Sequence, residues 1–553
     1  MAQRLEWQQV VAKKRGVRSA LLSTHQDVPI TPEGDTITNI SSVTDLVARL
    51  CSGELSSEAV IRAYIAKLVR SPGGERGYTG VKRDTLTQRT DKLIVRHRRS
   101  LTEVMFDAAI LRAQELDKYL ASEGRPVGPL HGIPMTLKDQ FDVKGIDSTI
   151  GYVGRAFHPA ERNSTLTEML LSLGAVIIAK TNLPQSIMWC ETENPLWGLT
   201  TNPLDSRYTP GGSSGGESAI LSCAGSMVGW GTDIGGSIRM PCHMMGLYGI
   251  KPTSSRLPYR GVPVSTEGQE HVPSAVGPIA RSLDSIYTTL KTVIDLKPWD
   301  FDARCVAVPW REDVFRETLK RPLVIGVLLD DGVVRPHPPI SRVLRSAIEA
   351  LRAAGHRIVD WNPDLHAECV EVMDQFYTVD GGEDIRKAVE IGGEPFIPRV
   401  EQLINSGEPL SVFEYWQLNK RKWELQQTYL DKWKSVLTDD GLSVDVTLMP
   451  TMPHTSVPHR ACRWVGYTKV WNVLDYPAMV IPGGAVNDQD LSAPWDYASR
   501  STLDEWNKVL WTGNRDDMAR LKLPVGLQIV GRRFDDERVL AAAKVLDDLL
   551  RAS

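Results

Sequence analysis

The chain has 553 residues, of which 42% are hydrophobic and 24% are charged, proportions typical of a globular protein with a large core. This size and composition exclude a small disulfide-stapled domain and an intrinsically disordered chain. The formal net charge of -4 offers no general attraction to nucleic acid or anionic lipid, so we expect neither as a partner.

Seven cysteines are scattered along the chain without CxxC or another metal-ligand spacing, which favours a reducing compartment and no metal site. Residues 1–22 mix basic and apolar side chains and lack the continuous apolar stretch of a signal peptide. The apolar run at residues 170–179 spans about half the length that a bilayer requires. We therefore expect a cytoplasmic protein without a membrane span.

The predicted elements begin with helices. Apolar residues recur at three- and four-residue steps through residues 43–68, and Ser56-Ser57-Glu58 is a plausible cap between two amphipathic helices. A third helix is predicted over residues 103–119, before Gly124 breaks the pattern. Beyond it the predicted elements alternate, with a strand at 133–137, a helix at 166–173, a strand at 175–180, a helix at 217–224 and a strand at 227–230.

This alternation is typical of an α/β fold in which a mixed β-sheet is layered between α-helices. We expect an N-terminal helical region, residues 1–100, to pack on a larger domain formed by residues 101–553. Residues 298–339 are rich in Pro, Asp and Arg and are predicted to be a surface excursion. The basic segment from Arg76 to Arg99 is interpreted as a solvated surface, with an anion or partner site as the alternative.

Two glycine-rich loops carry the strongest chemical signal. They read Pro-Gly-Gly-Ser-Ser-Gly-Gly-Glu at residues 210–217 and Gly-Thr-Asp-Ile-Gly-Gly-Ser-Ile-Arg at residues 231–239. Glycines at this density let backbone N–H groups approach a ligand, and each loop also contains serine. Upstream, a predicted strand leads into Lys138, and burial can deprotonate such a lysine near neutral pH and make it a general base.

Three other interpretations of these loops are weaker. A phosphate-binding P-loop needs GxxxxGK[ST], but neither glycine cluster is followed by lysine. Residues 212–216 match the GxSxG elbow with Ser214 as nucleophile, yet a polar stretch precedes them instead of a buried strand. Nothing in the spacing nominates His454 or His459 as the partner of Ser214. Glycine-rich turns with incidental serines are the purely structural alternative.

Residues 211–253 resemble the amidase signature family, through Gly-Gly-Ser-Ser-Gly-Gly-Glu, Gly-Thr-Asp-Ile-Gly-Gly-Ser-Ile-Arg-Met-Pro and Gly-Ile-Lys-Pro-Thr. Further segments with the family's pattern lie at residues 128–134, 180–185, 202–203 and 524–531. The segments that resemble the fungal acetamidase and general-amidase branch are the Trp7-Gln8 region, residues 191–194 and residues 471–477. The resemblance implies a single large amidase-signature domain of the α/β class.

The resemblance also implies a Ser-cisSer-Lys triad without metal or organic cofactor. In this triad Lys138 is the base, Ser213 the bridging serine and Ser237 the nucleophile. The residues implied to bind the substrate are Ile187, Met188, Ser213 and, as backbone donors of an oxyanion hole, Ile234, Gly235, Gly236 and Ser237. Asp233 and Arg239 flank the hole with opposite charges and are expected to brace the loop.

The implied reaction is hydrolysis of a small-molecule linear amide to an acid plus ammonia or an amine through an acyl-enzyme. The alternatives are an amidotransferase-type subunit that supplies ammonia to a partner, and a non-catalytic family member that only binds amides. The resemblance allows a homodimer. One departure from this branch is the segment from Gly73 to Arg99, which is longer and more basic than expected; we interpret it as a cover or regulator of the pocket entrance.

Overall fold

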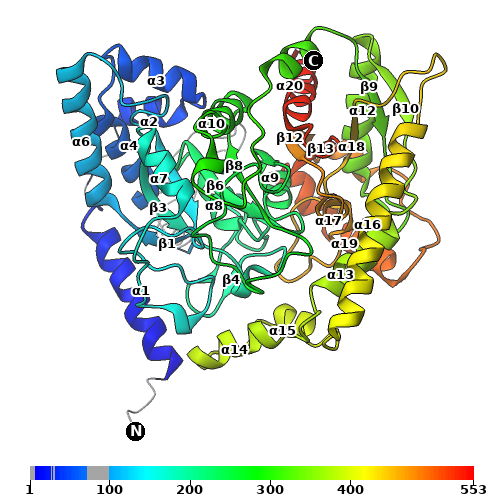
Figure 1. The fold of residues 1–553 in the computed structure, drawn as a ribbon, viewed down its shortest axis with the longest axis horizontal. Helices are drawn as coiled ribbons and strands as arrows, with labels where there is room; N and C mark the ends of the chain where they lie inside the picture. Colours follow the sequence, from blue (N-terminus) through cyan, green and yellow to red (C-terminus); the bar gives the residue numbers. More distant parts are fainter. Residues whose placement is uncertain (1–5, 27, 29–30, 71–98, 553) are drawn as a thin grey trace.

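The computed structural model of the chain describes residues 6–26, 28, 31–70 and 99–552. Within this part, eleven strands form one mixed sheet that runs through the molecule (Figure 1). In spatial order they are β1 (Leu101–Val104), β3 (Val176–Thr181), β2 (Pro134–Lys138), β6 (Val228–Asp233), β8 (Ala275–Ala280), β7 (Tyr248–Lys251), β12 (Ala478–Ala485), β13 (Pro524–Val530), β11 (Val446–Pro450), β9 (Val324–Val327) and β10 (Arg357–Asp360). Strand β2 is parallel to β3 and β6, and β9 is parallel to β10 and β11, whereas the other neighbouring pairs are antiparallel.

Helices precede, separate and follow these strands. The first group is α1 (Trp7–Ser23), α2 (Pro32–Asn39), α3 (Val43–Cys51), α4 (Ser57–Arg70), α6 (Phe106–Glu123), α7 (Thr165–Ser172), α8 (Gly215–Ser222), α9 (Arg239–Met245) and α10 (Leu283–Asp295). The second group is α11 (Glu312–Leu319), α12 (Pro338–Ala353), α13 (His366–Phe376), α14 (Glu383–Gly392), α15 (Pro398–Ile404), α16 (Val412–Ser435), α17 (Gly466–Val473), α18 (Asp488–Leu491), α19 (Thr502–Arg520) and α20 (Asp536–Ala552). Smaller elements are η1 (Val153–Arg155), η2 (Gln185–Ile187), η3 (Pro298–Asp300) and the two-stranded β4 (Glu193–Asn194) and β5 (Gly198–Leu199).

Both faces of the sheet are buried, as the alternation of side chains along β12 demonstrates. Met479 and Ile481 enter the main hydrophobic core, to which α12 and α20 contribute. Val480, between them, packs instead with Cys242 of α9 and Leu221 of α8. Because successive side chains of a strand point to opposite faces, α8 and α9 cover the face opposite α12 and α20. Burial on both faces explains why β12 begins with a continuous apolar run, Ala478–Ile481.

The predicted α/β class with a mixed sheet layered between helices is confirmed. The two amphipathic helices within residues 43–68 are α3 and α4, and the cap between them lies at the start of α4. The alternating elements after residue 130 are also present, as β2, α7, β3, α8 and β6. The sequence pattern therefore predicted the strands and helices that carry the glycine-rich loops.

Two predictions of local structure were wrong. The helix predicted over residues 103–119 begins at Phe106, because Glu103 and Val104 belong to β1, which pairs with β3, and Glu103 forms an ion pair with Lys14 of α1. Residues 298–339 are not merely a surface excursion. They contain α11 and β9, and β9 lies between β10 and β11 inside the sheet. The sequence pattern missed β9 because its apolar run, residues 323–328, is short and lies in a segment rich in proline and charged residues.

The N-terminal helices share the main core of the sheet. Helix α4 contacts β2 and β3, and its Val60, Ile61 and Ile65 are buried in that core. Residues 71–98, which include the basic segment except Arg99, lie outside the described residues, so the predicted cover over the pocket entrance stays a prediction. The domain boundary placed at residue 100 stays one too. None of the described helices is long and apolar enough to cross a lipid bilayer.

Candidate active site

The two glycine-rich loops meet at one edge of the sheet. Strands β2 and β6 are parallel neighbours, so their carboxyl ends, at Lys138 and Asp233, lie at the same edge. The loop before α8 and the loop between β6 and α9 are joined by a backbone hydrogen bond of 3.1 Å, donated by Ser214 N to the Ser237 carbonyl. The structure thus brings Lys138, Ser213 and Ser237 to one place from three separate segments.

Lys138 is completely buried and faces hydroxyl groups. Its Nζ lies 2.6 Å from Ser213 Oγ and 2.9 Å from Thr232 Oγ1. Burial lowers the pKa of Lys138 to about 7, although the negative charges of Asp233 and Glu217 act in the opposite direction. A large part of Lys138 is therefore an uncharged amine at neutral pH, with a lone pair that can accept a proton.

Thr232 fixes the orientation of this amine. The Thr232 hydroxyl donates to Gln140 Oε1 at 2.7 Å. Gln140 Nε2 donates to the Pro263 carbonyl at 3.0 Å, and this bond fixes which end of the Gln140 amide is the oxygen that faces Thr232. Since its only proton is used in this bond, Thr232 Oγ1 accepts an N–H from Lys138. The lone pair of a neutral Lys138 is then left for the hydroxyl of Ser213.

Glu217, in the first turn of α8, is the carboxyl group behind this site. Thr136 Oγ1 and Thr181 Oγ1 donate to it at 2.5 Å and 2.9 Å, and burial raises its pKa to about 8. A Cβ at position 229 would lie 2.1 Å from Glu217 Oε2, so glycine is needed there. Because Glu217 is mostly protonated at neutral pH, it does not hold Lys138 in the charged form.

Ser237 lies on the cavity side of the site and is 5% exposed, whereas Ser213 is 2% exposed. The peptide bond between Gly212 and Ser213 is cis. Among the described residues there is no direct hydrogen bond between the hydroxyls of Ser213 and Ser237; the two loops are linked through the Ser214 backbone instead. The contact between Lys138 and Ser213 is therefore present in this structure, and a hydrogen bond between the side chains of Ser213 and Ser237 is not.

The loop before α9 presents several backbone N–H groups. The Gly236 N–H donates to Asp233 Oδ1 at 2.8 Å, so it is engaged inside the protein rather than directed toward a ligand. The N–H groups of Ile234, Gly235 and Ser237 have no acceptor within the described ranges. Of the four expected backbone donors, Gly236 is therefore not available in this structure, and the role of the other three stays a prediction. A Cβ on Gly235 would lie 2.2 Å from the Tyr377 hydroxyl oxygen, so glycine lets Tyr377 approach the loop.

Asp233 and Arg239 form the brace of this loop. Both are fully buried, and Arg239 Nη2 lies 2.9 Å from Asp233 Oδ1. Asp233 also accepts a hydrogen bond from the Ile238 backbone, and Arg239 Nη2 donates to Asn472 of α17 at 2.7 Å. Burial alone raises the pKa of Asp233, but the charge and hydrogen bonds of Arg239 and the hydrogen bond from Asn472 outweigh it and hold this pKa far below its ordinary value. These contacts support the loop from behind.

We expect Asp233→Asn to lower the free energy of unfolding by about 3–5 kcal/mol, because the substitution leaves the Arg239 charge buried without its partner. Urea unfolding followed by circular dichroism measures this effect. The matched control is Asp548→Asn in the exposed Lys544–Asp548 pair of α20, for which we expect a change below about 1 kcal/mol. Equal effects of the two substitutions would contradict the bracing role of Asp233.

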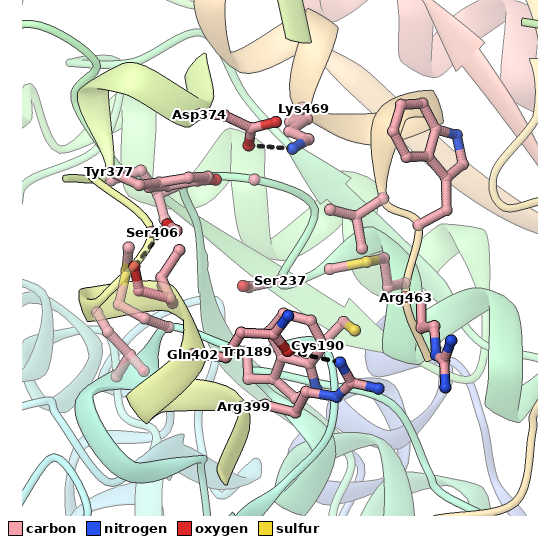
Figure 2. A pocket seen from close by; sticks show the side chains of 18 of the residues that line it. Trp189, Cys190, Ser237, Asp374, Tyr377, Arg399, Gln402, Ser406, Arg463 and Lys469 are labelled. Carbon is pink, nitrogen blue, oxygen red and sulfur yellow. Dashed lines mark hydrogen bonds and ion pairs between the residues drawn. The ribbon is translucent and has the colours of Figure 1, made fainter. Parts of the chain in front are cut away.

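A cavity of about 460 Å³ opens onto Ser237 (Figure 2). Ile187 and Met188, predicted to bind substrate, line it, as do Ile234, Gly235 and Met240. The lining also includes Trp189 and Cys190, which follow Met188 in the chain, and residues of more distant segments: Asp374, Tyr377, Arg399, Gln402, Leu403, Ser406, Arg463, Trp464, Val465, Lys469 and Leu503. Ser213 itself does not line this cavity, because it lies behind Ser237 next to Lys138.

The nucleophile-elbow interpretation of Ser214 does not fit this geometry. The Ser214 hydroxyl is buried and has no hydrogen-bond partner in the described part of the chain. His454 instead pairs through Nδ1 with the Thr455 carbonyl, and His459 pairs through Nε2 with the Ser206 carbonyl. Among the described residues, no group of three or more His, Cys, Asp or Glu side chains is placed to hold a metal ion.

Sequence reasoning missed several residues of the site. Thr232, Gln140 and Glu217 lie within or beside the quoted motifs, so the conjunction of a buried lysine with nearby hydroxyl and amide groups is a signal that could have found them. The cavity residues of α13, α15 and α17 carry no motif. They reach the site only through the packing of the second half of the chain.

Comparisons of the sequence and of the structure with known proteins all find amidases or amide hydrolases. A family model described as Amidase matches residues 86–540. The sequence is 47% identical to Amidase 1 of Gibberella moniliformis over 98% of this chain and 99% of that protein. It is 35% identical to an acetamidase of Emericella nidulans over 98% of each. Among solved structures, a fatty acid amide hydrolase is similar with a TM-score of 0.82 and 30% identity, over 100% of this chain and 91% of that chain.

Proposed function

Since the chain belongs to the amidase signature family and is an amide hydrolase, we propose that it cleaves linear carboxylic amides through an acyl-enzyme on Ser237, releasing an acid and ammonia or an amine. The observation that carries the proposal is the buried Lys138, whose Nζ lies 2.6 Å from Ser213 Oγ. An uncharged amine in this position can act as a general base, which a solvated lysine cannot do at neutral pH.

The first step is formation of the acyl-enzyme. When an amide binds, Ser237 Oγ turns toward Ser213, a movement of the kind expected where catalytic hydrogen bonds tighten only in the substrate complex. Lys138 takes the proton of Ser213, and Ser213 takes the proton of Ser237. The Ser237 oxygen attacks the carbonyl carbon, and the carbonyl electron pair moves onto oxygen.

The negative charge on that oxygen needs donors. The N–H groups of Ile234, Gly235 and Ser237 have no acceptor in the described part of the chain, and all three residues line the cavity, which supports them as an oxyanion hole. Donors of this kind contribute roughly 3–4 kcal/mol each to the transition state. The brace of Asp233 and Arg239 keeps the loop in position before the substrate arrives.

The leaving group takes the proton back along the same path. Protonated Lys138 returns a proton through Ser213 to the nitrogen, the carbon–nitrogen bond breaks, and ammonia or an amine departs. Water then attacks the acyl-enzyme by the same relay in the second half of the reaction, which releases the carboxylic acid and restores Ser237. Lys138 is uncharged again at the end of both acylation and deacylation, so the catalytic cycle needs no proton from another group.

We expect kcat/KM for a neutral amide to rise with pH through about 7 and then level off. Below this pH Lys138 is protonated and cannot accept a proton, and above it the amine is free; the midpoint follows from its lowered pKa. Steady-state kinetics from pH 5.5 to 9, with circular dichroism as the control for folding, measure the profile. A midpoint near pH 10 would contradict the proposal.

The proposed function is tested by covalent capture. Incubation of the purified chain with a fluorophosphonate should add one probe per molecule, and tandem mass spectrometry should place it on Ser237. The same preparation, without any added protein, should release ammonia from a simple amide such as hexanamide. Labelling of another serine, or ammonia release that depends on a second protein, would overturn the proposal.

A further inference from the structure

The outer part of the cavity carries two arginines without a carboxylate partner. Arg399 of α15 and the exposed Arg463, just before α17, both line it, and no ion pair within 4.0 Å joins either of them to another described residue. Arg399 is held in place by a hydrogen bond from Nη1 to Gln402 Oε1 at 2.7 Å and lies over the Trp189 ring at 5.7 Å. Its guanidinium is therefore fixed at the cavity wall without being neutralised.

The charges around the cavity leave an excess of positive charge. Besides the two arginines, the Lys and Asp side chains of its wall are Lys469 and Asp374, and these two form an ion pair with each other. In Figure 2, this pair lies on one side of Ser237, and Arg399 and Arg463 lie on the other. Glu191 interacts electrostatically with Arg399, but burial raises the pKa of Glu191 to about 7, so it is only partly charged. The described wall thus carries two uncompensated cations.

The rest of the cavity lining is mostly apolar. It includes Met188, Trp189, Leu403, Trp464 and Val465. A ligand that fills such a cavity needs an apolar middle, a polar reacting group at Ser237 and an anionic group at the far end. The planar fork of arginine suits a carboxylate, since two parallel N–H groups can donate to its two oxygens.

Resting on the amide hydrolysis proposed above, we propose that this site takes linear amides that carry a carboxylate at the end remote from the scissile amide. Monoamides of dicarboxylic acids are the simplest members of this class. Arg399 and Arg463 bind the carboxylate, the apolar wall contacts the connecting chain, and the amide carbonyl lies at Ser237. Arg399 and Arg463 are thus specificity-determining residues for the reaction.

The experiment compares three matched substrate series on the full-length protein. Each series has four to eight carbons in the acyl chain and ends in a carboxylate, a hydroxyl or an amine opposite the amide. Ammonia release gives kcat/KM for each compound. At the best chain length we expect the carboxylate to exceed the hydroxyl compound at least tenfold, and the amine compound to be the poorest substrate. This preference should weaken as salt is raised from 0.05 to 0.5 M.

Variants connect the preference to the two arginines. We expect Arg399→Gln and Arg463→Gln each to lower the ratio of kcat/KM for carboxylate over hydroxyl substrate about tenfold, and Arg463→Lys to lower it less. The matched control is Arg352→Gln on the exposed end of α12, outside the cavity, which should leave the ratio unchanged.

The outcomes separate this inference from the function on which it rests. Equal kcat/KM for the carboxylate and hydroxyl series, or a ratio unaffected by both arginine variants, would overturn the inference while amide hydrolysis stands. If none of the three series is hydrolysed faster than by the Ser237→Ala variant, both proposals fail. Fluorophosphonate labelling of Ser237 in the same preparation shows whether the protein is folded and reactive in that case.

Discussion

Replacing Ser237 by alanine is expected to lower kcat for amide hydrolysis by about four orders of magnitude or more. The reason is that no acyl-enzyme can form without its oxygen, while the oxyanion donors and the cavity remain. Stopped or continuous assays of ammonia release from hexanamide measure the loss, and the melting temperature of the variant shows that folding is unaffected. The residual rate is expected to come from binding and charge stabilisation alone.

The matched control for this substitution is Ser214→Ala, in the neighbouring loop. If the GxSxG elbow were correct, Ser214→Ala would produce the large loss and Ser237→Ala a small one. We expect the reverse, with a loss below about tenfold for Ser214→Ala, because its hydroxyl has no partner in the described part of the chain. A Ser237→Ala enzyme that keeps a tenth of the activity would refute the assignment of the nucleophile.

Lys138→Ala is expected to separate amides from esters. Loss of the base costs about 10²–10⁴-fold in general, but the larger part should fall on amides. An amine leaves only when protonated, and the relay from Lys138 supplies that proton, whereas an alkoxide leaves more readily. We expect kcat/KM for hexanamide to fall at least tenfold more than kcat/KM for methyl hexanoate.

The structural control is Thr232→Val, which removes the hydroxyl that orients the amine but keeps Lys138. We expect it to lower both rates moderately, since the base is present but its lone pair is less well directed. Equal losses of amide and ester hydrolysis in Lys138→Ala would contradict a proton relay to the leaving group and leave Lys138 a structural role only.

Much of this site could be predicted from the sequence because it is built from contiguous motifs. Lys138 ends an apolar strand, and the glycine-rich loops follow or precede regular elements, so their meeting at one edge follows from the order of parallel strands. The contact of Lys138 with Ser213 and the bracing pair of Asp233 and Arg239 lie where the motifs imply. Local sequence motifs and the order of the strands are enough to predict both of these contacts.

Other features depend on long-range packing that no local pattern reports. Glu103 reads as part of a helix but lies on β1, because Lys14 and the pairing with β3 decide its place. The Gly236 N–H reads as an oxyanion donor, yet its carboxylate acceptor three residues earlier engages it. The cavity wall formed by Arg399 and Arg463 brings together segments more than about 180 residues away from the first glycine-rich motif, so only the three-dimensional structure reveals it.

The account as a whole depends on the charge state of one buried amine. Nuclear magnetic resonance of protein labelled with ¹³C at the lysine ε-carbon, with the Lys138 signal assigned by its loss in Lys138→Ala, reports that charge directly as pH is varied. The account predicts a titration midpoint near pH 7. A midpoint close to that of a solvent-exposed lysine, near pH 10.4, would contradict it.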